Sequence, residues 1–221
     1  INDDNTSWYN IESSKNFDID FDVAIANGNM NLFDYIKSFK KHVISYSLQS
    51  LEKFFRKRKL LPYLKYKPSI LVIGKYHKSK RSKLISMFGS NILPLAIDEK
   101  FNNTKLSNEI DNNLAIFTSR ADRNMDLLIE IWNSKIQIKN SKLKLLVTPP
   151  LINTSNPNIV ARSLRSKDLL IKDLLKSRLF LVPGHKAELY CLAAEEAREL
   201  CLPIVTLGIG SLSERVVHGK T

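Results

Sequence analysis

One stretch near the end of the chain constrains the fold more than any other: residues 177–221, SRLFLVPGHKAELYCLAAEEARELCLPIVTLGIGSLSERVVHGKT. An apolar strand is predicted over Leu179–Val182 and ends at a Pro-Gly break. A helix is predicted over Ala193–Leu200, and a second buried strand over Pro203–Leu207. Strand, helix and strand joined by short connections form a parallel βαβ unit. The sequence therefore predicts an α/β fold built on a parallel sheet.

Two polar loops follow these strands, over residues 185–188 and 208–213, and both are predicted to open on the carboxyl edge of the sheet, where ligands bind. Glu188 lies in the first loop and Glu196 in the helix, and two carboxylates facing one crevice can accept hydrogen bonds from sugar or ribose hydroxyls. The turn at Gly210-Ser211 offers small residues and backbone amides to a phosphate. Spacing alone favours a plainer interpretation, in which the helix presents a solvated charged face made of Glu195, Glu196, Arg198 and Glu199.

The order of these residues resembles the donor-binding domain of retaining GT-B glycosyltransferases of the group 1, or family-four, type. The hallmark of that family is a Glu, seven residues, Glu-Ala, a Leu-Pro-Val-Val strand and a Gly-Gly-x-x-Glu turn. The chain has Glu188, seven residues, Glu196-Ala197, then Leu202-Pro203-Ile204-Val205 and Gly210-Ser211-Leu212-Ser213-Glu214. The match departs from the family at Leu189-Tyr190-Cys191, where Gly-Phe-Gly is usual.

A pair of arginines occupies an earlier strand-to-helix loop. A strand is predicted over Leu114–Thr118, and Arg120 and Arg123 follow it just before a predicted helix. Two guanidinium groups beside a helix N-terminus can clamp a diphosphate, although both could equally be surface arginines. The resemblance implies that Arg120 matches the family's arginine and Arg123 its lysine, which together neutralise the pyrophosphate of the donor.

The resemblance implies an α/β fold of GT-B type with two Rossmann-like parallel-sheet domains, the first incomplete at its N-terminus. It also implies a retaining, metal-independent glycosyltransferase of hexosyltransferase type, without a cofactor, that moves a sugar from a nucleotide-diphospho-sugar to a hydroxyl. Glu188 would be the catalytic residue and orient the donor sugar. The donor-binding residues would be Arg120, Arg123, Glu196, Gly210, Ser211 and Glu214. No Asp-x-Asp motif or His/Cys cluster with ligand spacing occurs, so no metal site is expected.

The chain is predicted to divide into four parts. Residues 1–20 form a polar N-terminal segment, 21–101 the remainder of the acceptor-side domain, 102–113 a linker, and 114–221 the donor-binding domain with its C-terminal end missing. The chain begins at Ile1 and ends at Thr221, where the family continues. We therefore expect a fragment of a longer protein.

A net charge of +12 and a pI near 9.6 indicate an anionic partner, which could be nucleic acid, a phospholipid surface or a phosphorylated substrate. The segment Leu51–Lys67 concentrates this charge, since seven of its seventeen residues are Lys or Arg, interleaved with aromatic and leucine side chains. It fits a basic amphipathic helix at an anionic membrane, broken or kinked at Pro62. It also fits nucleic-acid binding, or a solvated helix with Phe54, Leu61 and Leu64 in the core. Nucleic acid is the least expected of these partners.

The expected partners are a nucleotide-sugar and a glycan or lipid acceptor, such as a lipid-linked or cell-envelope glycan in lipopolysaccharide synthesis. No run approaches the roughly 20 apolar residues of a membrane span, and Cys191 and Cys201 do not suggest a disulfide framework. A cytoplasmic protein, peripheral on the inner face of the membrane, is therefore expected. Two other functions stay open: a non-catalytic nucleotide-sugar-binding relic of the same fold, and a basic nucleic-acid-binding α/β protein.

Overall fold

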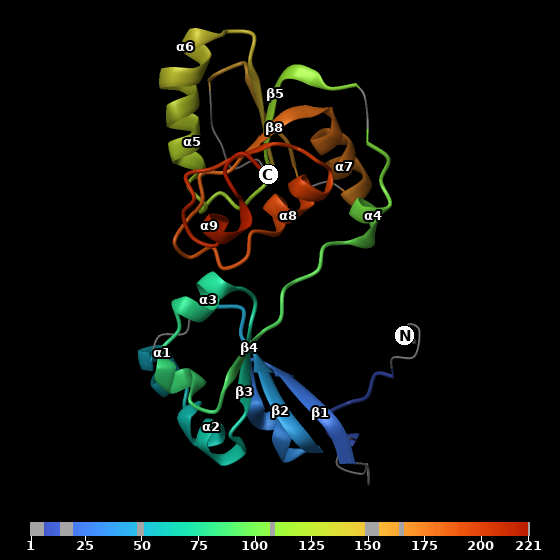
Figure 1. Cartoon of the computed structure of the whole chain (residues 1–221), viewed down its shortest axis with the longest axis vertical. Helices are drawn as coiled ribbons and strands as arrows, with labels where there is room; N and C mark the ends of the chain where they lie inside the picture. Colours follow the sequence, from blue (N-terminus) through green and yellow to red (C-terminus); the bar gives the residue numbers. More distant parts are fainter. Residues whose placement is uncertain are drawn as a thin grey trace. The chain divides into compact units, whose positions relative to one another are not determined.

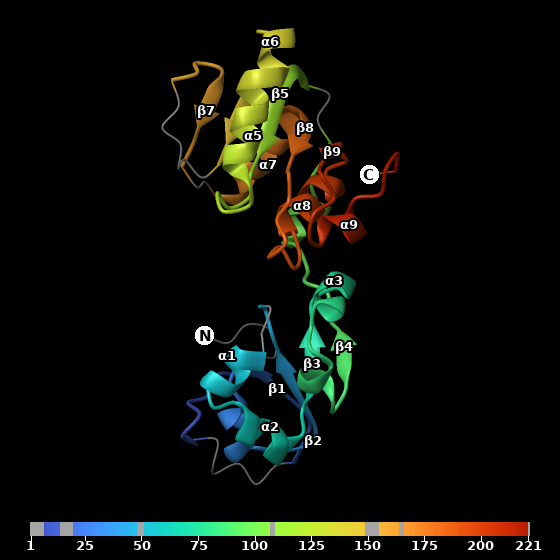
Figure 2. The same cartoon turned by 90° about the vertical axis from the view of Figure 1, so that its left-hand side faces the viewer.

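The computed structural model describes residues 7–13, 20–47, 51–106, 109–148, 155–163 and 166–220. These form two compact units, Ile1–Pro94 and Leu95–Thr221, and each unit is built on its own parallel sheet (Figures 1 and 2). Most of the predicted polar segment 1–20 lies outside the described residues. Within the described ranges, no helix has both the length and the apolar character needed to span a bilayer.

The first unit has a four-stranded parallel sheet in the order β1-β2-β3-β4. Its elements are β1 (Asp20–Asn27), the 3-10 helix η2 (Met30–Asp34), β2 (Lys37–Ile44), α1 (Leu51–Arg56), α2 (Leu60–Tyr66), β3 (Ser69–Val72), α3 (Lys75–Ser79), the 3-10 helix η3 (Lys83–Ser86) and β4 (Ser90–Ile92). The core of this unit packs Phe54 of α1 and Tyr63 of α2 against Ile70 and Val72 of β3.

The basic segment Leu51–Lys67 is two short helices, which corrects the expected single helix broken or kinked at Pro62. The break falls at Arg58, whose backbone is left-handed with φ 51°. Pro62 instead lies in the first turn of α2, where the missing amide is not needed for a helical hydrogen bond. Phe54 is buried as expected for a core residue, whereas Leu61 is 76% exposed and Leu64 is 42% exposed, so these two do not belong to the core.

The second unit has a five-stranded parallel sheet in the order β7-β6-β5-β8-β9. Counted along this unit, the strand order is 3-2-1-4-5, which is the order of a Rossmann-type sheet. Its elements are α4 (Glu99–Asn102), β5 (Asp111–Phe117), α5 (Met125–Ile131), the π-helix η4 (Trp132–Ile136), α6 (Gln137–Lys139), β6 (Lys144–Val147), β7 (Ile159–Ala161), α7 (Lys167–Lys176), β8 (Ser177–Leu181), α8 (Leu192–Glu199), β9 (Ile204–Val205) and α9 (Leu212–Arg215).

Alternate residues of the central strands enter two different cores, one on each face of this sheet. Ile116 of β5 packs with Leu174 of α7 and Ala197 of α8. Its neighbour Phe117 packs on the opposite face with Trp132, at the end of α5. Side chains of successive strand residues point to opposite faces, so helices on both sides bury a nearly continuous apolar strand. The α/β prediction is confirmed.

The boundary between the units lies at Pro94–Leu95, before the predicted linker 102–113. Phe101 of α4 is 1% exposed and packs in the same core as Ile116, so the end of the segment assigned to the first domain belongs to the second unit. Residues 111–113 are already part of β5. A polar composition suggested a linker here, but a single buried aromatic side chain ties the preceding turn to the second core.

Candidate functional site

Three loops of the second unit gather at the carboxyl ends of neighbouring strands. The loop after β5 carries Arg120 and Arg123, the loop after β8 carries Glu188, and the loop after β9 carries Gly210 and Ser211. In a sheet of this strand order, the crevice between the first and fourth strands is where connections leave to opposite faces and where ligands bind. Here those strands are β5 and β8. The arginine loop and the Glu188 loop therefore flank this crevice.

Arg123 and Glu188 form an ion pair across the crevice. The Nε of Arg123 donates to Oε2 of Glu188 at 2.9 Å, and the two side chains are only 12% and 16% exposed. Arg123 also lies 3.1 Å from the carboxylate of Asp122. The predicted guanidinium and the predicted acid are therefore brought together, with surroundings that exclude most of the solvent.

The glycine turn after β9 fixes the backbone of the Glu188 loop. The amide of Ser211 donates to the carbonyl of Glu188 at 2.9 Å, and Gly184 pairs with Ile209 in an isolated parallel bridge. Gly210 has φ 72°, and a Cβ there would meet the carbonyl oxygen of His185 and lie 3.0 Å from that of Glu188. The two loops thus share one edge, as the sequence predicted.

This arrangement changes what Gly210 and Ser211 can do. Ser211 is fully buried, its amide is engaged by Glu188, and its hydroxyl accepts a hydrogen bond from the amide of Cys191 at 3.3 Å. The expectation that the Ser211 amide is presented to a phosphate is therefore wrong for this conformation, because that donor already has an acceptor. Both residues instead hold Glu188 in position.

Arg120 lies at the rim of the same crevice. Its side chain is 74% exposed, and it contacts Asp122 at 2.8 Å. Asp122 therefore bridges Arg120 and Arg123. Asn124 has a left-handed backbone and donates its side-chain amide to the carbonyl of Gly184, which joins this loop to the loop after β8.

Glu196 sits apart from the Arg123–Glu188 pair and is held by a lysine. It is 8% exposed, and its carboxylate accepts from Nζ of Lys167, the first residue of α7, at 2.8 Å. Glu195 is 7% exposed. The interpretation of a solvated helix face is thus wrong for both acids. Sequence reasoning missed Lys167, although a lysine at a helix N-terminus opposes the helix dipole and so suggests a tertiary partner.

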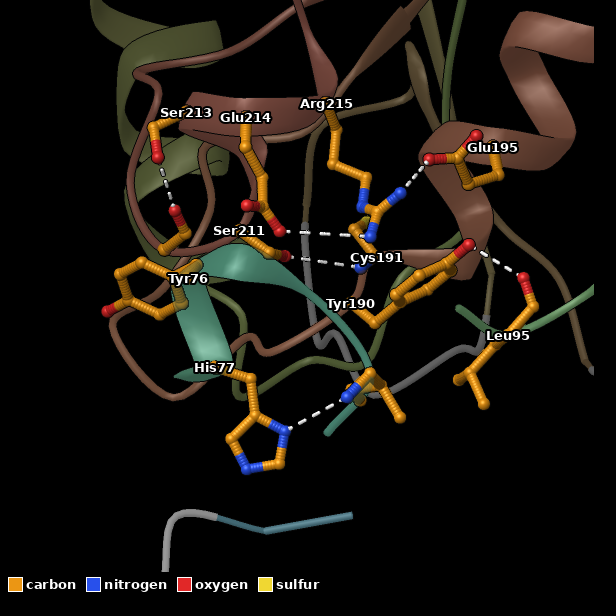
Figure 3. Close-up of polar contacts among 12 residues, drawn as sticks. Tyr76, His77, Leu95, Tyr190, Cys191, Glu195, Ser211, Ser213, Glu214 and Arg215 are labelled. Atoms are coloured by element: carbon orange, nitrogen blue, oxygen red, sulfur yellow. Dashed lines mark hydrogen bonds and ion pairs between the residues drawn. The ribbon is translucent and has the colours of Figure 1, made fainter. Parts of the chain in front are cut away.

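A further cluster surrounds Tyr190 and was not predicted (Figure 3). The guanidinium of Arg215 lies 3.6 Å from the ring centroid of Tyr190 and 2.7 Å from a carboxylate oxygen of Glu195. The predicted donor-binding residue Glu214 is 19% exposed and lies 3.8 Å from Arg215. The tyrosine hydroxyl donates to the carbonyl of Leu95 at 2.6 Å. Arg215 adjoins the glutamate of the family-like turn, and that adjacency is the signal that could have pointed to it.

Two other chemistries have little support in this unit. Burial, and then the charge of Glu188, raises the pKa of the Cys191 thiol to about 12, so the thiol is not activated as a nucleophile. Among the described residues, no three His, Cys, Asp or Glu side chains are arranged as a metal-binding group.

No family model and no curated protein sequence matches the chain. Solved structures do. HepE from Anabaena, in complex with UDP and glucose, aligns at TM-score 0.67 and 11% identity over 95% of this chain and 64% of its own. Sucrose-phosphate synthase from Thermosynechococcus elongatus aligns at 0.64 and 12% over 89% and 58%. S. aureus TarM, in complex with UDP and a GlcNAc-glycerol, aligns at 0.60 and 14% over 85% and 40%.

These neighbours are GT-B glycosyltransferases, and the chain has their type of fold, with two parallel-sheet units. The chain spans about 40 to 64% of the length of these three structures. At 11 to 14% identity the likeness concerns the fold, so the activity has to be argued from the site.

Proposed function

We propose that the chain is a glycosyltransferase that moves a sugar from a nucleotide-diphospho-sugar donor to a hydroxyl acceptor, with retention and without a metal ion. One observation carries this proposal. A shielded guanidinium–carboxylate pair, Arg123–Glu188, lies where the loops after β5 and β8 meet at the switch point of a Rossmann-type sheet. Structures of the same fold bind UDP and sugars, as HepE does.

The pair combines the two chemistries that such a donor requires. A guanidinium placed beside the departing diphosphate stabilises the charge that develops on it, and stabilisation of this kind lowers the barrier. The adjacent carboxylate can accept hydrogen bonds from the hydroxyls of the sugar. In the proposed complex Arg123 turns part of its donor set from Glu188 to the diphosphate, and the exposed Arg120 adds a second cation at the rim.

Glu196 has the proposed role of binding the ribose hydroxyls. Lys167 holds one of its carboxylate oxygens, and the other can accept from the ribose. Glu214 is proposed to act at the edge of the donor site, beside Arg215. Gly210 and Ser211 contribute by fixing the loop of Glu188.

The experiment is transfer and hydrolysis of labelled UDP-, GDP-, ADP- and CMP-linked sugars by the full chain, together with thermal stabilisation by each. We expect one nucleotide class to stabilise the protein and to be turned over. Glu188→Gln should abolish turnover and keep the fold, since the amide is isosteric. Stabilisation without turnover in the wild-type chain would identify a binding relic instead. An absence of both, with stabilisation by single-stranded oligonucleotides, would favour nucleic-acid binding.

We also propose that the acceptor is lipid-linked or part of an envelope glycan, met at the inner face of an anionic membrane. The support is a surface on α1 and α2 where exposed apolar residues stand among basic ones. Phe55 is 53% exposed and Leu61 is 76% exposed, beside Arg56, Lys57 and Lys65. Basic residues near an anionic leaflet contribute about 1 kcal/mol each, and apolar side chains add insertion.

Sedimentation with vesicles tests this membrane proposal. The double substitution Phe55→Ser and Leu61→Ser leaves every cation in place and should weaken binding to phosphatidylglycerol vesicles. Substituting Ile138, which is 77% exposed in the second unit, by Ser is the matched control and should have no effect. Equal vesicle binding by the double variant and the wild-type chain would contradict the proposal.

A further inference from the structure

A polar cavity of about 520 Å³ lies in the first unit, at the point where β1 ends. One wall is the turn Gly28–Asn31, and the other is formed by Lys57, Arg58, Lys59 and Pro62 at the junction of α1 and α2. The volume falls in the range of ligand pockets, which is roughly 300 to 1,000 Å³. The cavity lies entirely within the first unit and shares no residue with the Arg123–Glu188 site.

The cavity is lined by three consecutive cations and by no carboxylate. Neighbouring basic residues are compensated: Lys65 pairs with Asp34 at 2.7 Å, and Arg56 with Glu52 at 3.8 Å. Within the part of the chain that the structure describes, neither Lys57 nor Arg58 nor Lys59 has an acidic partner. Like charges held together without a counter-charge favour an anion between them.

Lys59 is the most enclosed of the three. Its ammonium donates to the carbonyl of Gly28 on the opposite wall of the cavity. Burial, and then the nearby charge of Lys57, lower the pKa of Lys59. A bound anion would relieve both effects, because it supplies the opposite charge and replaces lost hydration.

The backbone that presents these cations is built in a costly way. The amide of Arg58 donates to the carbonyl of Phe55 at 2.9 Å, and the amide of Lys59 to that of Phe54 at 3.2 Å. These are the two bonds of a Schellman motif, whose left-handed position is normally glycine. Here the position is Arg58, with φ 51°. Residues held in such conformations cluster at ligand clamps.

We propose that this cavity binds a phosphoryl group, esterified to a glycan acceptor or to a lipid, through Lys57, Arg58 and Lys59. Three adjacent cations match the three oxygens of a phosphate monoester. The remaining volume accommodates part of the esterified group. The identity of this group as acceptor rests on the proposed glycosyl transfer, whereas the phosphate site itself does not.

The chain itself supplies a matched pair of variants. Arg58→Gly removes one cation and at the same time relieves the left-handed backbone, so it should fold at least as well as the wild-type chain. Cys201 occupies the equivalent position after α8, with φ 56° and amide bonds from Cys201 to Arg198 and from Leu202 to Ala197. Cys201→Gly therefore repeats the backbone change without removing a charge.

The test is a titration of the full-length, ¹⁵N-labelled chain with inorganic phosphate and with glycerol 3-phosphate at low ionic strength. We expect saturable shifts of the amides of Gly28 and residues 57–59. Arg58→Gly should weaken the affinity about tenfold, as for loss of one charge-assisted hydrogen bond. Cys201→Gly should match the wild type. No saturable shift at these amides, or equal affinity in Arg58→Gly, would overturn the proposal.

Vesicles separate the two sources of phosphate. If the group belongs to a lipid, Arg58→Gly should reduce binding to phosphatidylcholine vesicles that contain phosphatidic acid more than binding to phosphatidylglycerol vesicles, since only the former present a monoester. If it belongs to a glycan, both vesicle types should be bound equally by the variant and the wild-type chain, while the shifts with glycerol 3-phosphate remain. A separate titration with the nucleotide-sugars reads the amide of Glu188, and failure there counts against the donor site alone.

Discussion

The guanidinium of Arg123 and the carboxylate of Glu188 meet at 2.9 Å, although 65 positions separate them in the chain. Each belongs to a loop that follows a different strand of the second sheet, β5 or β8. Both side chains are largely shielded from water. The pair therefore joins two loops at the carboxyl edge and defines the centre of the proposed donor site.

A double-mutant cycle on this pair should show strong coupling. Arg123→Gln and Glu188→Gln each leave one charge without its partner, whereas the double variant leaves none. We expect an interaction energy of about 1 to 3 kcal/mol in the free energy of unfolding, measured by urea denaturation. The exposed pair Lys100–Asp168, at 3.0 Å, is the control and should couple by less than about 1 kcal/mol. Additive effects for Arg123 and Glu188 would show that the contact contributes nothing.

Gly210→Ala should displace Glu188 and destabilise the second unit. The added Cβ would meet the carbonyl of His185, and φ 72° is strained for alanine. Gly208→Ala is the control, because it has a similar φ of 66° with nothing within 4 Å. We expect a loss of about 1 kcal/mol for Gly208→Ala and of about 3 kcal/mol for Gly210→Ala. Equal losses in thermal or urea unfolding would mean that close contact with the Glu188 loop is unimportant.

Lys167→Met should weaken nucleotide binding through Glu196. The ammonium of Lys167 fixes that carboxylate at 2.8 Å, and without it the nearly buried acid is uncompensated and reorients. We expect the dissociation constant of the nucleotide-sugar to rise by about tenfold, measured by calorimetry, if the contact is worth about 1.4 kcal/mol. Lys172→Met, on an exposed position of the same helix, should leave it unchanged. Unaltered affinity in Lys167→Met would remove Glu196 from the site.

His77 should make the stability of the first unit depend on pH. It is fully buried in α3, and burial, followed by the charge of Arg81, lowers the pKa of His77 to about 4. The unfolded chain takes up the proton near pH 6.5, before the folded chain does, so the free energy of unfolding should fall as pH drops from about 6.5 to about 4. The slope from one proton is at most about 1.4 kcal/mol per pH unit.

The substitution His77→Asn isolates this effect. Asparagine can keep an acceptor for the amide of Ile73, which now donates to Nδ1 at 3.4 Å, but it does not titrate. We expect the variant to lose the excess slope between pH 6.5 and 4, measured by urea unfolding at several pH values. His218→Asn, at an exposed position, should retain it. Parallel pH profiles for wild type and His77→Asn would contradict the assignment.

Much of the fold could be read from local patterns. The strand–helix–strand order of residues 177–207 fixes a parallel pairing of β8 and β9, and parallel strands bring their following loops to one edge. The convergence of the Glu188 loop on the Gly210 turn followed from that connectivity. The break inside Leu51–Lys67 did not, because a left-handed arginine at a helix end leaves no signature in composition, and Pro62 drew the prediction to the wrong place.

The sequence by itself determined the layered α/β architecture and the residue types available at the carboxyl edge, because hydrophobic periodicity and chain connectivity are local properties. Only the tertiary structure decided the pairings. It joined Arg123 to Glu188, Lys167 to Glu196, and Arg215 to Tyr190. It also assigned Phe101 to the second core and Ser211 to a structural role. Such contacts depend on which surfaces meet after packing, since charges and amides choose the partner that burial leaves within reach.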